Sequence, residues 1–262
     1  MGLDIDRHSH VESAVQAWDP RFKIACLGSF ALVAAVLQTL PLALTAFLIS
    51  VLILLVSKIP MGFVYTAMKW LVILLLPFFL ILPLTYPGEV SSEIWGIPFA
   101  IEGVRMSIMI VVKAMATMTI AFVIFGSARF DISMVALQHL KCPKIIVQML
   151  LFSYRYIFLF LSEMRRLDTA MKARGFVKKP NMYTVKVIGG FVGTLLIRSF
   201  ERTERIFSAM LSKGYQGELH SMIEFKSNSK DKIKALLMIT LTVAIIAVDL
   251  SGVFAVAEQA WY

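Results

Sequence analysis

Long stretches without a charged residue alternate with shorter polar connections along the chain. No Asp, Glu, Lys or Arg occurs in four runs, Ile24–Ser57, Trp70–Gly88, Ala114–Ala128 and Ala235–Val248. A helix of about 20 mostly apolar residues crosses the hydrocarbon core of a bilayer and satisfies its own backbone hydrogen bonds there. The pattern therefore predicts an all-α membrane protein with about five transmembrane helices.

The run Ile24–Ser57 is too long for a single span. As one helix its 34 residues would extend about 50 Å, whereas the hydrocarbon core measures about 30 Å. Pro41 suits the first turn of a second helix, so we expect a hairpin around Gln38–Leu40. The other three spans are expected at Trp70–Tyr86, kinked by Pro77 and Pro83, at Val104–Gly126 and at Ala235–Ala257.

These spans divide the chain into four parts. Residues 1–23 form an N-terminal arm, residues 24–126 carry the first four transmembrane helices, residues 127–232 form a coupling region, and residues 233–262 hold the fifth helix and a tail. The longest charge-free run of the coupling region, Val187–Ile197, has only 11 residues and is too short to span. We expect this region to form long amphipathic helices along or beneath the membrane face.

The distribution of charge predicts an orientation. Residues 127–232 contain 18 Lys and Arg against 8 Asp and Glu, although the whole chain has a net charge of only +9. Arg21 and Lys23 directly precede the first span, and Lys58 and Lys69 lie between the second and third spans. Residues 87–103, in contrast, carry three Glu and neither Lys nor Arg. Because basic loops favour the cytoplasm, we expect the N-terminus and the coupling region there and the C-terminus outside. The basic residues alternate with apolar ones at helical spacing and form no recognition motif, so nucleic acid is not an expected partner.

A 15-residue pattern occurs twice in the coupling region, as Ser162–Phe176 and Glu201–Tyr215. Four positions are identical and five are similar. The identical pairs are Arg166 with Arg205, Ala170 with Ala209, Met171 with Met210, and Gly175 with Gly214. In each copy a small residue separates two cations at intervals of four, which places all three on one helix face. These triplets are Arg166, Ala170 and Arg174 in the first copy, and Arg205, Ala209 and Lys213 in the second.

Each copy predicts a helix that stops at its glycine. Glycine is common at the left-handed position after a helix, and a cation just before it is stabilised by the negative end of the helix dipole. An aromatic residue follows each glycine and is available as an anchor for a partner. One copy alone is ordinary chemistry of a helix end. Two copies in one basic region imply two similar docking sites for two similar partners.

The two helix ends resemble a known family. Ala173-Arg174-Gly175 and Ser212-Lys213-Gly214 are similar to the paired Ala-Arg-Gly motifs of the transmembrane T component of energy-coupling factor transporters. The second copy departs from the motif, since it keeps the charge but loses the planar fork of Arg. Asp19-Pro20-Arg21 is similar to the segment before the first span of that family, and the resemblance covers essentially the whole chain.

This resemblance implies a scaffold subunit of an importer in the prokaryotic cell membrane. Two ATP-binding-cassette ATPases would bind the two motif helices, and a small membrane protein would capture the substrate. ATP and Mg²⁺ would bind those ATPases, so no cofactor or metal is expected on this chain. Residues 3–8 are more similar to the cobalt/nickel branch than to the vitamin branch, which stays an alternative.

Functions of other classes find less support in the sequence. The chain has no GxxxxGK[ST] loop for ATP phosphates and no GxSxG or HExxH motif. An intramembrane enzyme needs several ionisable groups at one depth, but only Lys113 and Asp249 lie well inside the predicted spans. A pore-forming permease would need more polar side chains along its path. Since Lys113 and Asp249 lie at similar depths, we expect them to form an ion pair.

Overall fold

The computed structural model describes residues 15–16, 18–85, 92–94, 97–99, 101–217 and 228–251. The chain divides into two units, and each is considered by itself. The membrane unit comprises Ile5–Leu140 and Phe225–Tyr262. The motif unit comprises Lys141–Glu224, with which Met1–Asp4, outside the described residues, is grouped.

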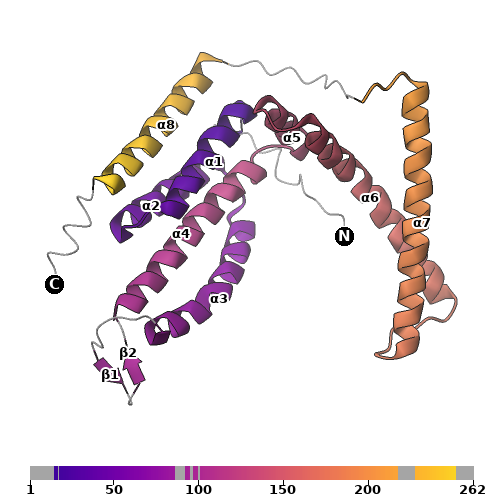
Figure 1. Ribbon diagram of the computed structural model, residues 1–262, viewed down its shortest axis with the longest axis horizontal. Helices are drawn as coiled ribbons and strands as arrows, with labels where there is room; N and C mark the ends of the chain where they lie inside the picture. Colours follow the sequence, from indigo (N-terminus) through magenta and orange to yellow (C-terminus); the bar gives the residue numbers. More distant parts are fainter. Residues whose placement is uncertain are drawn as a thin grey trace. The chain divides into compact units, whose positions relative to one another are not determined.

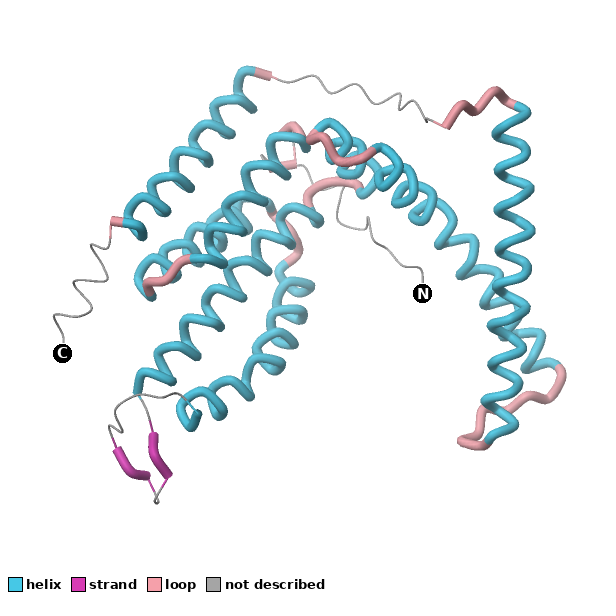
Figure 2. Tube along the Cα trace, in the orientation of Figure 1, coloured by secondary structure: helices cyan, strands magenta, loops and turns pink. Residues whose placement is uncertain are grey.

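The described elements are almost all helical, which confirms the predicted fold class (Figures 1 and 2). The membrane unit contains α1 (Pro20–Val36), α2 (Leu40–Ser57), α3 (Met61–Thr85), α4 (Ile101–Gly126), α5 (Phe130–His139) and α8 (Ser229–Leu250). Between α3 and α4, strands β1 (Ser92–Ile94) and β2 (Ile97–Phe99) pair antiparallel, with Ser92 opposite Phe99. The motif unit contains α6 (Lys144–Ala173) and α7 (Met182–Ser212).

The predicted hairpin in the first apolar run is confirmed. Helix α1 ends at Val36, and α2 begins at Leu40 with Pro41 in its first turn. Helix α3 begins at Met61, earlier than predicted, because the charge of Lys69 does not interrupt a helix. Both prolines of α3 lie inside the helix, which curves visibly in Figure 1. The predicted end of the last span at Ala257 lies outside the described residues.

Six helices in the described part of the chain are long and apolar enough to cross a membrane, namely α2, α3 from Val64, α4, α6, α7 and α8. The sequence predicted about five spans and did not count α6 or α7 among them. Helix α1, which it did count, has 17 residues and lies at the lower end of the range for transmembrane helices. The chain is a multi-pass membrane protein.

Helix α1 forms the centre of the membrane unit. It packs against α2, α4, α5 and α8, and its Leu27 and Phe30 are fully buried, as are Ile120 and Val123 of α4. Helix α5 also packs on α1 and buries residues 133–136. The predicted coupling region began at residue 127, whereas the structure divides the chain after Leu140. The amphipathic pattern of α5 could not show which neighbour it packs against.

Helices α3 and α4 approach each other closely at Gly103. A Cβ atom built on Gly103 would lie 2.6 Å from both the Leu82 carbonyl oxygen and the Pro83 Cα. Nearby, the Ser107 hydroxyl donates a hydrogen bond to the Phe78 carbonyl at 3.0 Å. Small residues at this crossing therefore let the two backbones touch, as is common between membrane helices.

Replacing Gly103 with Ala is expected to destabilise the protein by about 1–3 kcal/mol, the usual cost of forcing extra atoms into a packed site. The added methyl meets backbone atoms, which cannot rotate away. Gly28→Ala is the matched control, because nothing lies within 4 Å of a Cβ at that position in α1. Thermal unfolding in detergent should show a lower Tm for Gly103→Ala only. Equal Tm values for the two variants would contradict the close approach.

Candidate functional site

The first motif forms the end of α6. Arg174 caps the helix and Gly175 follows with φ +79°. The Gly175 backbone N–H donates to the Lys172 carbonyl at 3.0 Å, and the Phe176 N–H donates to the Met171 carbonyl at 3.1 Å. This pair of hydrogen bonds is the Schellman motif, which needs the left-handed conformation that glycine adopts without strain.

The second motif repeats this geometry at the end of α7. Lys213 caps the helix, and Gly214 has φ +84°. The Gly214 N–H donates to the Leu211 carbonyl at 2.9 Å, and the Tyr215 N–H donates to the Met210 carbonyl at 3.0 Å. The predicted helix ends are therefore confirmed. The departures of the second copy, Ser for Ala and Lys for Arg, leave the backbone of the motif unchanged.

Both helix ends present the predicted residues to the surface of the unit. All ten are exposed, namely Arg166, Ala170, Ala173, Arg174 and Gly175 on α6, and Arg205, Ala209, Ser212, Lys213 and Gly214 on α7. Nothing lies within 4 Å of a Cβ built on either glycine. The Arg205 Nε donates to the Glu201 carbonyl of its own helix at 3.3 Å. Each end is thus an accessible cation beside small residues, where a partner can approach closely.

Helices α6 and α7 form an antiparallel pair. The Tyr215 hydroxyl donates to Gln148 Oε1 at 3.3 Å, which joins the end of α7 to the beginning of α6. At the other end the rings of Phe176 and Tyr183 lie 6.5 Å apart. The motifs therefore occupy opposite ends of the pair. Because each helix has about 30 residues, they are separated by about 45 Å.

The aromatic residues after the glycines, Phe176 and Tyr215, are partly exposed and contact other residues of their own unit. Phe176 contacts Tyr183 of its own unit. Tyr215 lines a cavity of about 360 Å³ between α6 and α7. The other lining residues are Phe152, Ser153, Tyr156, Phe160, Arg202, Thr203, Ile206, Phe207 and Met210. Each aromatic ring thus has contacts within the motif unit, and its role as an anchor for a partner stays a prediction.

The turn between α6 and α7 is fastened by a residue that the sequence analysis missed. Asp168 lies 2.6 Å from the Lys172 ammonium and 3.5 Å from the Lys178 ammonium. The Lys179 N–H donates to the Thr184 hydroxyl at 3.2 Å. Asp168 therefore joins the last turn of α6 to the segment beyond Gly175. Its position four residues before Lys172 was the available signal.

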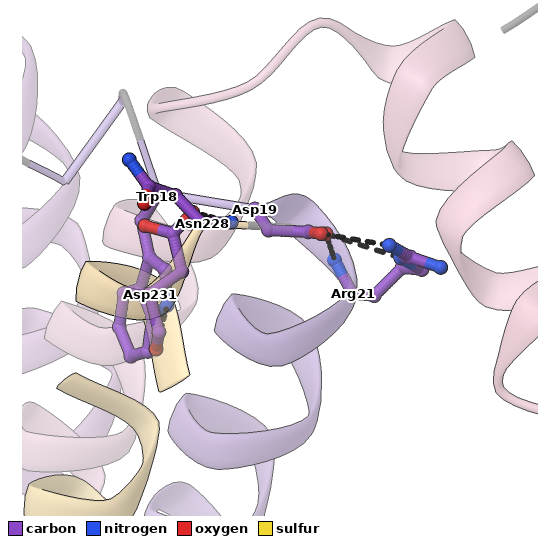
Figure 3. Close-up of polar contacts among 5 residues, drawn as sticks. All are labelled: Trp18, Asp19, Arg21, Asn228 and Asp231. Carbon is purple, nitrogen blue, oxygen red and sulfur yellow. Dashed lines mark hydrogen bonds and ion pairs between the residues drawn. The ribbon is translucent and has the colours of Figure 1, made fainter. Parts of the chain in front are cut away.

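The segment Asp19-Pro20-Arg21 forms the beginning of α1 (Figure 3). Asp19 is the N-cap, and its Oδ1 accepts a hydrogen bond from the Arg21 N–H at 3.0 Å. The Arg21 side chain returns to the same carboxylate with bonds of 3.2 Å from Nε and 2.9 Å from Nη2. Burial opposes ionisation of Asp19, but the hydrogen bonds from Arg21 hold its pKa below the ordinary value. Proline suits the first helical position, so the sequence itself dictates this helix start.

Asp249 lies where α8 meets the turn between α1 and α2. Its carboxylate accepts hydrogen bonds from the Gln38 N–H at 3.3 Å and from the Thr39 hydroxyl at 3.2 Å. Among the described side chains, the ion pairs within 4.0 Å do not include Lys113 with Asp249. The contacts that the structure gives Asp249 hold the α1–α2 turn.

Comparison with known proteins identifies the family of the chain. Residues 12–223 match the family described as cobalt transport protein, CbiQ. The chain is 29% identical over 222 residues to the energy-coupling factor transporter transmembrane protein EcfT of Bacillus selenitireducens, covering 79% of this chain and 81% of that protein. It is 25% identical over 252 residues to an uncharacterized protein of Methanocaldococcus jannaschii, covering 93% and 86%.

The matching family and the Bacillus relative identify a transmembrane subunit of a transporter. The chain belongs to the cobalt transport protein family. Its resemblance to the T component of energy-coupling factor transporters is confirmed by this family and by the Bacillus relative. The family is non-catalytic, so the chain is not an enzyme and the alternative of an intramembrane enzyme is set aside.

Proposed function

We propose that the chain links two ATP-binding-cassette ATPases to a small membrane subunit that captures the substrate. The observation that carries this proposal is the repeated helix end. Two exposed cations, Arg174 and Lys213, each precede a left-handed glycine in the same Schellman geometry. Two equal sites about 45 Å apart suit two equal partners, one at each end of the helix pair.

Each end offers the same chemistry to its partner. The cation is a donor for a carboxylate, and the dipole of the helix leaves partial negative charge on the last carbonyl groups. Arg174 can bind a carboxylate with two parallel hydrogen bonds, whereas Lys213 acts as a point charge. The adjacent small residues, Ala173 and Ser212, let the partner come close. ATP and Mg²⁺ belong to the ATPases in this proposal.

The charge pattern of α6 and α7 supports a position along the membrane face. Each helix is mostly apolar in its first half and charged in its second half, from Glu163 in α6 and from Arg198 in α7. The charges in the first halves are Lys144, Arg155 and Lys186. Because the pair is antiparallel, the charged half of one helix runs beside the apolar half of the other. Two upright spans side by side would place one charged half in the hydrocarbon core, which is costly. Helices lying in the interface, with the motifs toward the cytoplasm, avoid this cost.

This arrangement suggests how the subunit works. ATP-driven closing of the two ATPases moves the two motif ends, and this movement changes the angle between α6 and α7. The change then reaches the membrane unit and tips or releases the capture subunit. In the proposed orientation the N-terminus and the motif unit are cytoplasmic and the C-terminus is external.

Cobalt or nickel is the proposed cargo, and of these two ions the description of the family names cobalt. The test is to express the chain with the ATPases and the capture subunit of the same organism, purify the complex through a tag on this chain, and measure ⁵⁷Co²⁺ and ⁶³Ni²⁺ uptake in proteoliposomes. We expect the ATPases to co-purify and uptake to require ATP. Failure of the ATPases to co-purify would contradict the scaffold role, and uptake of a vitamin instead would contradict the cargo.

A further inference from the structure

A fully buried lysine lies at the beginning of α1. Lys23 has no exposed surface, and its ammonium donates to three oxygens on two other segments. These are Ser127 Oγ at 2.9 Å, the Ser127 carbonyl at 3.2 Å and the Val15 carbonyl at 3.4 Å. All three N–H donors of the ammonium are therefore satisfied, which is what allows a charge to be buried.

Ser127 is held firmly at this contact. It is itself buried, and its hydroxyl donates to the Val123 carbonyl while accepting from Lys23. It stands in the short turn between α4 and α5, and α5 leads directly to the end of the membrane unit at Leu140. Lys23 thus fixes the segment through which the chain leaves the membrane unit.

A second contact lies five residues earlier in the chain. The buried indole of Trp18 donates from Nε1 to the carbonyl of Asp231 at 3.2 Å. Figure 3 shows Trp18 beside Asp231 at the first turn of α8, close to Asn228. The side chains of Asn228 and Asp231 form a capping box that begins this helix. Trp18 therefore fixes the segment through which the chain returns to the membrane unit.

Between these two contacts Asp19 and Arg21 hold the backbone rigid. The carboxylate of Asp19 accepts hydrogen bonds from the backbone and the side chain of Arg21, and Asp19 caps the first turn of α1. These bonds set the positions of Trp18 and Lys23 relative to each other. One short segment, Trp18–Lys23, thereby holds both connections to the motif unit, although these connections lie about 100 residues apart in the chain. If Trp18 and Lys23 served only to fill the core, the two connections would not need to meet at the same segment.

We infer that Trp18 and Lys23 form a clamp that fastens both connections of the motif unit to the first turn of α1, so that a movement of α6 and α7 is passed to the membrane helices. This inference rests on the proposed function. The two residues are positioning residues, because they act through Ser127 and Asp231 and bind neither ATPase nor cargo. Without the clamp the two connections move relative to α1. The ATPases then move the motif unit without moving the helices of the membrane unit.

The test uses the complete reconstituted transporter with two conservative variants. Trp18→Phe keeps an aromatic ring but loses the indole donor, and Lys23→Met keeps the length of the side chain but loses the ammonium. The matched controls are Trp70→Phe and Lys69→Met, the same changes at exposed positions of α3. If Lys23→Met fails to insert, Ser127→Ala removes the shortest of the same hydrogen bonds.

We expect both clamp variants to co-purify the ATPases and to hydrolyse ATP as the parent does. Uptake of ⁵⁷Co²⁺ or ⁶³Ni²⁺, divided by the amount of folded complex, should fall by about fivefold or more, the factor that one lost hydrogen bond carries. A merely structural role would lower the amount of complex and leave this ratio unchanged. An unchanged ratio, or the same loss in the α3 controls, would overturn the inference. A parent complex that lacks ATPases or takes up neither ion contradicts the proposed function instead, so the two failures can be told apart.

Discussion

Reversing the charge of Arg174 and Lys213 together, with glutamate at both positions, should abolish recovery of the ATPases with this chain. Removing one partner of a buried, hydrogen-bonded charge pair costs about 2–5 kcal/mol, and a reversal adds repulsion to that loss. Each single variant should therefore weaken binding by about 30-fold or more. Arg174→Glu should be the worse of the two, because Arg can form two parallel bonds to one carboxylate. Affinity purification followed by immunoblotting for the ATPases measures the effect.

The control for this experiment must change the same charge elsewhere on the motif unit. Lys179 and Lys186 are exposed and lie outside both motifs, so their double change to glutamate is suitable. Lys178 is less suitable because its ammonium already pairs with Asp168. The control double variant should recover the ATPases nearly as well as the parent. Equal losses in the two double variants would mean that diffuse charge, and not the two helix ends, attracts the ATPases.

Replacing Gly175 and Gly214 with Val should also uncouple the ATPases, although no charge is changed. Their φ values of +79° and +84° are strained for a β-branched residue, at a cost of about 1–3 kcal/mol at each site. The helix ends must then unwind or continue, and either change moves the neighbouring cation. We expect recovery of the ATPases to fall at least fivefold for each single variant, in the same assay.

Asparagine provides the matched control for these glycines, because it tolerates the left-handed conformation better than other residues with a side chain. Gly175→Asn and Gly214→Asn should keep both helix ends and most of the ATPase recovery. Circular dichroism should show equal helix content in all variants, since only the last turns are affected. If the Val variants bind the ATPases as well as the Asn variants do, the geometry of the helix end does not matter for docking.

The first helical hairpin and the ends of α6 and α7 could be predicted because strong local rules fix them. The thickness of the bilayer forces the run Ile24–Ser57 to fold into two helices. The left-handed preference of glycine fixes where α6 and α7 stop. The repeat made the second helix end visible, even though Lys213 and Ser212 depart from the first copy. In these cases the sequence contains the whole physical cause.

The features that the sequence did not reveal depend on long-range packing. Lys23 adjoins an apolar run and is charged, so surface exposure was the natural expectation, yet Ser127 and Val15 bury it completely. The carboxylate of Asp249 lies on the α1–α2 turn because the end of α8 packs there. Phe176 and Tyr215 contact other residues of their own unit because α6 and α7 pair. The position of each of these side chains depends on a contact residue more than 60 positions away in the sequence, or on the pairing of α6 with α7.

In the proposed function, one copy of this chain binds two ATPases through two equivalent helix ends. Native mass spectrometry of the detergent-purified complex counts the subunits directly. We expect two ATPase subunits for each copy of this chain, and loss of the ATPases when both Arg174 and Lys213 are changed to glutamate. One ATPase for each chain, or two that remain bound after both cations are reversed, would contradict the proposed function.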